Sequence, residues 1–280
     1  MPTHHTTPVQ QLVRSELRGD VMLILMADST RRNALSVALV SELIDTIRWS
    51  RTVGARAVVI GSAERAFCAG ADIRDMLESG WLDPQPSSTA PLTPPDLFAE
   101  IERDSRPILA AVDGMALGGG VELCLACDLV LAGPSASFMF PELALGVLPN
   151  TALARLPHLI GARAAADLIL TRRRIDAAEA FRLGLVNELV SGPDALERCL
   201  AMAQDIVARV PPVALGAAKR LLKGATDWPA ISAMLAEMDP AEWREGVTAF
   251  LDKRTPDYRP FWQASVGTVQ QATRMNKEIV

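Results

Sequence analysis

The sequence LGGGVEL at residues 117–123 carries most of the information about the fold, because three successive glycines open an apolar segment with the pattern of a helix. Glu122 falls in the first turn of that helix, and a second acidic residue, Glu142, follows in FPE at 140–142. Glycines leave the N–H groups of a helix N-terminus accessible, and these groups favour negative charge. Two carboxylates beside such amides indicate an enzyme that stabilises an oxyanion and moves a proton next to it.

A second junction of the same kind lies upstream, in RAFCAGADI at residues 65–73. It follows an apolar run at 57–62 that predicts a strand, and the small residues at 69–71 let the backbone approach a ligand closely. Asp72 then stands at the start of a helix expected from Ile73 onward. We therefore expect one N–H group from each junction to converge on a single oxygen.

Strand and helix patterns alternate up to about residue 190, beginning with a strand at 21–26 and a helix at 37–48. The runs at 21–26, 57–62, 107–112 and 128–132 are too apolar to have one solvent-facing side, which indicates a buried sheet covered by helices. Strand signals stop beyond residue 193, and helices are expected at 194–210, 212–224, 228–238 and 241–253. The pattern predicts an α/β protein with a domain change near residue 200.

The ends and one internal segment depart from this pattern. Residues 1–14 are predicted to be a disordered tail, and residues 259–280 a C-terminal extension. Residues 78–98 contain five prolines, which predicts a long loop. This loop is either a tolerated surface insertion or, because it follows the 65–73 motif directly, an active-site lid.

The chain has 280 residues, 49% of them hydrophobic, with a net charge of −5. This composition is typical of a globular protein, and the acidic balance argues against nucleic acid as a partner. The sequence contains no 18-residue uncharged apolar run, so we expect no membrane span. Residues 1–10 lack the apolar core of a signal peptide, and we expect a cytoplasmic protein. No cluster has metal-ligand spacing, so no metal is expected.

Cys124 and Cys127 have the CxxC spacing of redox proteins. They lie inside an apolar helical segment, which favours buried core cysteines over reactive thiols. Thiol redox chemistry nevertheless remains an alternative, and it predicts a thiol of low pKa.

In their order and spacing, several motifs together resemble the crotonase superfamily, which is the enoyl-CoA hydratase/isomerase family. The resemblance covers roughly residues 15–258. The matching motifs are RAFCAGADI (65–73), PILAAVDGMALGGGVELCLACD (107–128), FPE (140–142), DAAEAFRLGLVN (176–187) and WREGVTAFLDKR (243–254).

The resemblance implies an α/β fold in which a crotonase-like ββα spiral core (15–200) holds an acyl-CoA site and is followed by a helical trimerisation unit (201–258). Members form trimers, often hexamers, and need no cofactor besides the coenzyme A carried by the substrate. The oxyanion-hole amides fall on Ala71 and Gly119. The two catalytic glutamates of the hydratases fall on Glu122 and Glu142, which hold one water and add it across a 2-enoyl-CoA thioester.

The resemblance also implies a set of substrate-binding positions. Arg32 and Ala34 fall in the segment that runs beside the nucleotide, and Lys253 and Arg254 fall near the end that reaches a neighbouring subunit. The full set is Arg32, Ala34, Ala69, Asp72, Ile73, Leu117, Gly118 and Pro141.

One segment departs from the family pattern. After Pro149 the family usually shows a glycine-rich turn, whereas this chain has NTALA at 150–154. Since non-glycine residues do not adopt glycine dihedrals without strain, we expect this segment to follow a different path, which bears on the position of Glu142. Hydration is the leading prediction; an enoyl-CoA isomerase, another crotonase-type enzyme and a non-catalytic acyl-CoA-binding homologue are alternatives. The protonated glutamate and the acyl chain are left open.

Overall fold

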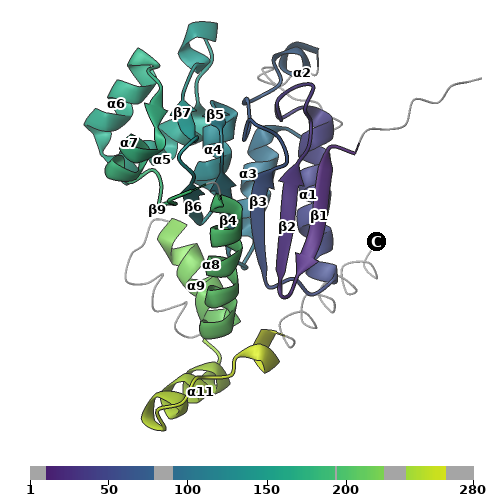
Figure 1. Cartoon of the computed structure of the whole chain (residues 1–280), viewed down its shortest axis with the longest axis vertical. Helices are drawn as coiled ribbons and strands as arrows, with labels where there is room; N and C mark the ends of the chain where they lie inside the picture. The colour runs from purple at the N-terminus through teal and green to yellow at the C-terminus, as the bar shows by residue number, and fades with distance from the viewer. Residues whose placement is uncertain (1–10, 79–90, 193, 224–237, 263–280) are drawn as a thin grey trace, which may run out of the picture.

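The computed structural model describes residues 11–78, 91–192, 194–223 and 238–262 (Figure 1). Its main sheet has six strands in the order β1-β2-β3-β4-β6-β9. Strand β1 runs antiparallel to β2, and all other neighbours in this sheet are parallel. The strands are β1 (Val13–Arg18), β2 (Val21–Met26), β3 (Ala57–Ser62), β4 (Ile108–Val112), β6 (Leu129–Ala132) and β9 (Glu188–Leu189). The predicted strands at 21–26, 57–62, 107–112 and 128–132 are confirmed to within one residue.

A smaller sheet of three strands, in the order β5-β7-β8, lies beside the main one. Its strands are β5 (Met115–Leu117), β7 (Ser137–Met139) and β8 (Ile175–Asp176). Strand β5 ends directly before the glycines at 118–120, and β7 ends just before Glu142. Because β5 and β7 pair in parallel, the two acidic motifs emerge at the same edge of this sheet.

Helices cover both faces of the main sheet. Side chains alternate across each strand, so Met22 and Val58 face the core that includes helix α1, whereas Leu23 and Val59 face helix α8. The helices are α1 (Val37–Thr52), α2 (Ile73–Glu78), α3 (Pro94–Arg103), α4 (Gly119–Ala126), α5 (Asn150–Ile160), α6 (Ala162–Thr171), α7 (Ala177–Leu183), α8 (Ala195–Arg209), α9 (Pro212–Lys223) and α11 (Pro240–Leu251), with a 3-10 turn η1 (Glu142–Leu145). None of the helices within the described ranges is long and apolar enough to cross a membrane.

The predicted domain boundary at residue 200 falls inside α8. This helix packs on the main sheet through Leu200, Ala203 and Val207, and the Trp262 indole N–H donates to the Val207 carbonyl at 3.1 Å. Residues near 262 therefore return to the same core as the sheet. The role of residues 201–258 in oligomerisation stays a prediction.

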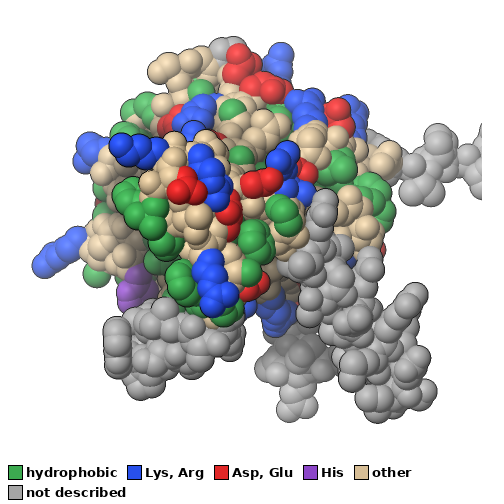
Figure 2. All heavy atoms as spheres, turned by 90° about the horizontal axis from the view of Figure 1, so that it is seen from below, with side chains coloured by type: hydrophobic (Ala, Val, Ile, Leu, Met, Phe, Trp, Pro, Cys, Tyr) green, Lys and Arg blue, Asp and Glu red, His purple; other side chains and the backbone are tan. Residues whose placement is uncertain are grey.

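Helix α11 lies at the end of the molecule farthest from the small sheet (Figure 1). Figure 2 shows this end, where hydrophobic side chains lie in patches between basic and acidic ones. The side chains of Trp243, Val247 and Phe250 on α11 are exposed to solvent.

Regular secondary structure begins inside two segments that were predicted to be irregular. The disordered tail predicted for 1–14 is wrong for its last two residues, because β1 begins at Val13. The Val13 N–H also donates to the Glu42 carboxylate at 3.1 Å. The loop predicted for 78–98 is wrong beyond residue 93, because α3 begins at Pro94. Two prolines suit the first turn of a helix, and the Asp96 carboxylate accepts both the N–H and the hydroxyl of Thr93.

Several other predictions lie outside the described residues. Residues 79–90, on which the lid hypothesis rests, are among them, as are nearly all of the helix predicted at 228–238 and most of the C-terminal extension.

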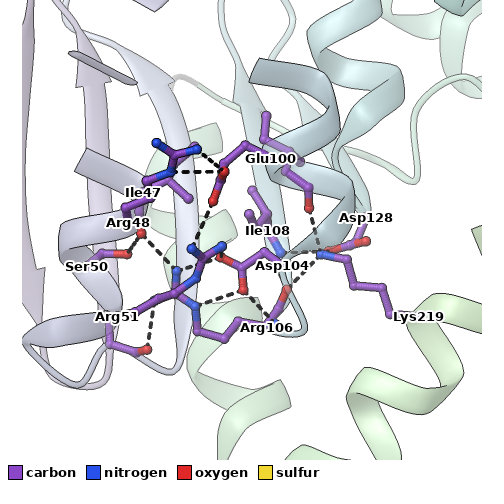
Figure 3. Close-up of polar contacts among 12 residues, drawn as sticks. Ile47, Arg48, Ser50, Arg51, Glu100, Asp104, Arg106, Ile108, Asp128 and Lys219 are labelled. Carbon is purple, nitrogen blue, oxygen red and sulfur yellow. Dashed lines mark hydrogen bonds and ion pairs between the residues drawn. The ribbon is translucent and has the colours of Figure 1, made fainter. Parts of the chain in front are cut away.

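A buried network of ion pairs connects α1, α3 and the start of β4 (Figure 3). Arg106 donates from Nε and a terminal nitrogen to the two carboxylate oxygens of Asp104, at 3.0 and 2.7 Å. Its other contacts are the carbonyls of Ala55 and Ile47, and Asp104 also accepts from Arg51 at 2.9 Å. Burial alone would raise the pKa of Asp104, but the hydrogen bonds from Arg106 and the charges of Arg106 and Arg51 together outweigh it, and the pKa is lowered.

Candidate active site

The two glycine-rich junctions lie directly against each other. A Cβ atom built on Gly70 would stand 2.7 Å from the Leu117 carbonyl oxygen, and one built on Gly119 would stand 3.2 Å from the Ala71 nitrogen. The Leu117 N–H also donates to the Cys68 carbonyl at 2.9 Å. Glycine is thus required at residue 70 for close backbone approach as well as for its φ of 95°.

Two backbone N–H groups at this junction, those of Ala71 and Gly119, make no hydrogen bond within the described part of the chain. Leu35 forms an isolated parallel β-bridge with Ala71, in which it donates to the Gly70 carbonyl and accepts from the Asp72 N–H. The N–H of Ala71 itself takes no part in this bridge. Gly119 is the first residue of α4, and the first N–H groups of a helix have no partner within the helix. The arrangement can therefore present two N–H groups to one ligand oxygen.

Glu122 is held by the first turn of α5. Its Oε1 accepts the N–H groups of Thr151 at 2.8 Å and Ala152 at 3.1 Å. Burial raises the pKa of Glu122, and these two hydrogen bonds offset part of that rise because they stabilise the ionised form.

Glu142 occupies a different environment. It begins η1, and a Cβ atom built on Gly118 would stand 2.4 Å from its Oε1, so no larger residue fits at 118 with this side chain in place. Its Oε2 is buried and has no hydrogen-bond partner among the described residues. Burial, opposed by a hydrogen bond from the backbone of Glu142 itself and assisted by the charge of Glu122, raises the pKa of Glu142 to about 7.

The NTALA segment forms the beginning of α5. None of residues 150–154 has a positive φ, so the glycine dihedrals of the family turn are not needed here. The segment forms a regular helix N-terminus, and its departure from the path of the family turn stays a prediction. It supplies the Thr151 and Ala152 amides to Glu122, and it makes no recorded hydrogen bond to Glu142.

Asp72 caps helix α2. Its Oδ1 accepts the N–H groups of Arg74 and Asp75, and its Oδ2 accepts from Arg31 at 3.0 Å. These contacts give Asp72 a structural role, and its part in substrate binding stays a prediction. The neighbouring Ile73 is 54% exposed.

The other predicted substrate-binding residues surround the junctions. Gly118 and Ala34 are buried, Ala69, Leu117 and Pro141 are half-buried, and Arg32 is exposed. Ala69 donates to the Arg32 carbonyl at 3.1 Å, which places the Arg32 backbone beside the 69–71 segment.

A cavity of about 410 Å³ adjoins Arg32, and Arg65 lines it as well. The other lining residues are Ser29, Glu64, Ala66 and Met115. Arg65 was absent from the predicted binding set, although it opens the 65–73 motif. Arg254, in contrast, is bound to both carboxylate oxygens of Glu245, at 2.7 and 2.9 Å.

The cysteines do not support redox chemistry. Cys68, Cys124, Cys127 and Cys199 are all free and buried. Burial raises the pKa of Cys127 to about 12, the opposite of what a reactive thiol requires. Within the described part of the chain, no group of three or more His, Cys, Asp or Glu side chains is arranged to hold a metal ion.

Comparison with known proteins identifies the family of the chain. The family model described as enoyl-CoA hydratase/isomerase matches residues 16–260. The chain belongs to this family, as its motifs predicted. The α/β fold with a crotonase-like core is likewise confirmed by solved relatives.

Among the similar proteins, the 2,3-dehydroadipyl-CoA hydratase of Escherichia coli K12 is 36% identical, with 85% of this chain and 95% of that protein covered. The mitochondrial enoyl-CoA hydratase domain-containing protein 2 of Mus musculus is 35% identical, with 91% of each chain covered. The crystal structure of the enoyl-CoA hydratase of Bacillus anthracis has a TM-score of 0.75 at 29% identity and covers 89% of this chain and 99% of that one.

Proposed function

We propose that the protein is an enoyl-CoA hydratase that adds water across the 2,3 double bond of a 2-enoyl-CoA thioester. The observation that carries this proposal is the pair Glu122 and Glu142, placed in unlike environments beside the amides of Ala71 and Gly119. An isomerase needs only one acid–base carboxylate, so the presence of two favours hydration.

In the proposed reaction the thioester carbonyl accepts hydrogen bonds from Ala71 and Gly119. Glu122, whose ionised form is stabilised by two amides, takes a proton from water, and the hydroxide adds to the β-carbon. The π electrons move onto the carbonyl oxygen, where the two amides stabilise the negative charge. The enolate then takes a proton at its α-carbon from Glu142, whose raised pKa suits a proton donor.

This chemistry needs no metal or redox cofactor, and the proposal includes none. We extend it to a homotrimer or hexamer, for which the exposed apolar side chains on α11 are supporting evidence. A cytoplasmic location is also part of the proposal, although the Mus musculus relative is named mitochondrial.

The test is loss of the 2-enoyl thioester absorbance with crotonyl-CoA and with 2,3-dehydroadipyl-CoA, whose hydratase is a relative. Hydration of either supports the proposal, and the ratio of kcat/KM values ranks the acyl chains. Conversion of a 3-enoyl-CoA without hydration would identify an isomerase. Binding of an acyl-CoA without any turnover would identify a non-catalytic homologue.

The raised pKa of Glu142 predicts a pH-dependent stability. Because the folded protein holds this proton between its ordinary pKa of 4.5 and about 7, the Glu142 contribution to the free energy of unfolding is fully present below 4.5 and is lost as pH rises through about 7. Glu142→Gln removes that loss. Urea unfolding of both proteins across this range measures the difference, and parallel pH curves would contradict the prediction.

The cavity beside Arg32 and Arg65 predicts where the phosphates of coenzyme A bind. Arg32→Ala and Arg65→Ala should each weaken coenzyme A binding by about two- to fivefold, the scale of an exposed charge interaction. Because salt screens such charges, the effect should be larger at low ionic strength. Titration calorimetry at two salt concentrations measures it, with Arg163→Ala on α6 as the control. A loss independent of salt would remove these residues from the phosphate site.

A further inference from the structure

We propose that Asn33 is a positioning residue that fixes the direction of the Ala71 N–H. Asn33 touches neither of the carboxylates and was not among the predicted site residues. The inference rests on the proposed function, since it concerns the amide that would bind the thioester oxygen.

The side chain of Asn33 is completely buried, and both its amide oxygen and its amide nitrogen are hydrogen-bonded. Its Oδ1 accepts from the Asp28 N–H at 2.8 Å. The two hydrogens of its Nδ2 are shared among three acceptors, the Ser62 hydroxyl at 2.8 Å and the carbonyls of Ala66 and Phe67 at 3.2 and 3.1 Å. The hydrogen bonds of Asn33 therefore connect the loop after β2 with the end of β3 and with the backbone that precedes residues 69–71.

The residues on either side of Asn33 hold the 69–72 backbone. The Arg32 carbonyl accepts from Ala69 at 3.1 Å, and Leu35 donates to the Gly70 carbonyl at 2.7 Å and accepts from Asp72 at 3.3 Å. These three bonds bracket Ala71. A shift of Asn33 would carry Arg32 and Leu35 with it, and the Ala71 amide would turn away from the Gly119 amide.

The backbone at Asn33 permits a sharp test. Its φ is 55°, a left-handed conformation that asparagine tolerates and glycine adopts freely. Asn33→Gly therefore keeps the backbone conformation and removes only the anchoring side chain. Asn33→Asp keeps the shape but turns a carboxylate oxygen toward two carbonyl oxygens. Arg172, also at a positive φ of 56° but exposed on the end of α6, provides the matched control Arg172→Gly.

The experiment measures kcat and KM for hydration and the absorption maximum of bound cinnamoyl-CoA. Hydrogen bonds to the thioester carbonyl polarise this chromophore and move its absorption to longer wavelength. We expect Asn33→Gly and Asn33→Asp to lower kcat by about 10²-fold, as for a displaced oxyanion donor, with a smaller change in KM. The wavelength shift should shrink in both variants and stay complete in Arg172→Gly.

The outcomes separate this inference from the proposed function. An unmodified protein that neither hydrates enoyl-CoA nor shifts the absorption overturns both. An active unmodified protein whose Asn33→Gly variant keeps its kcat and its full wavelength shift overturns the positioning role alone. Because the shift is measured per bound ligand, partial loss of folded protein does not imitate the expected result.

Discussion

Glu122→Gln and Glu142→Gln should each lower kcat for enoyl-CoA hydration by about 10²–10⁴-fold, the usual contribution of a general acid or base. Both substitutions preserve shape. The amide oxygen of Gln at 122 can still accept the N–H groups of Thr151 and Ala152, and Gln at 142 still fits against Gly118. The loss therefore reports proton transfer rather than displacement. Steady-state kinetics with crotonyl-CoA measures it.

The control for this pair is Glu197→Gln, an exposed glutamate on α8 that pairs with Arg18 and should leave kcat unchanged. Retention of more than a tenth of the activity by either active-site variant would contradict the two-carboxylate reaction. If one variant kept an isomerase activity while hydration disappeared, the alternative reaction would need only the other glutamate.

Asp104→Ala should lower the free energy of unfolding by about 3–5 kcal/mol, because it leaves the buried guanidinium of Arg106 without its partner. The side chains of Asp104 and Arg106 are only 1% and 8% exposed. Arg51 also loses its contact with Asp104, although it keeps its ion pair with Glu100 at 2.9 Å (Figure 3). Urea denaturation measures the change.

An exposed ion pair supplies the control for the buried one. Asp205→Ala breaks a pair with Arg209 whose side chains are 51% and 71% exposed. Pairs of this kind contribute roughly 0–1 kcal/mol. A similar loss in both variants would mean that the buried network contributes no more than a surface contact. Because the pKa of Asp104 is lowered, its contribution should also disappear as pH falls through that pKa.

The sequence predicts those parts of the fold that are buried on both sides. Strands β2, β3 and β4 are continuous apolar runs, and their limits agree with the structure to within one residue. Strand β1 was missed because four of its six residues are exposed, so it shows no alternating pattern. Strands β8 and β9 have two residues each, too few for any periodicity.

The residues of the candidate site were likewise predictable only where they belong to a local motif. Glu122 and Glu142 are identifiable because each belongs to a compact motif. Glu122 is held by the amides of Thr151 and Ala152, which belong to another helix about thirty residues away in the sequence. A contact at this separation cannot be predicted from a local sequence pattern. Asn33 was missed for the same reason, since its partners Ala66 and Phe67 meet it only through the packing of the loop after β2.

The position of α8 in the sequence determines when the main sheet can be covered during synthesis, because the chain leaves the ribosome N-terminus first. Strand β9 can close the edge of the main sheet once residue 189 has emerged, but the helix that covers Val21, Val59 and Leu109 follows it. Until residue 209 is free, the nascent sheet carries an uncovered apolar face, which is prone to aggregation. A pause in translation just after β9 would therefore leave this protein most dependent on chaperones.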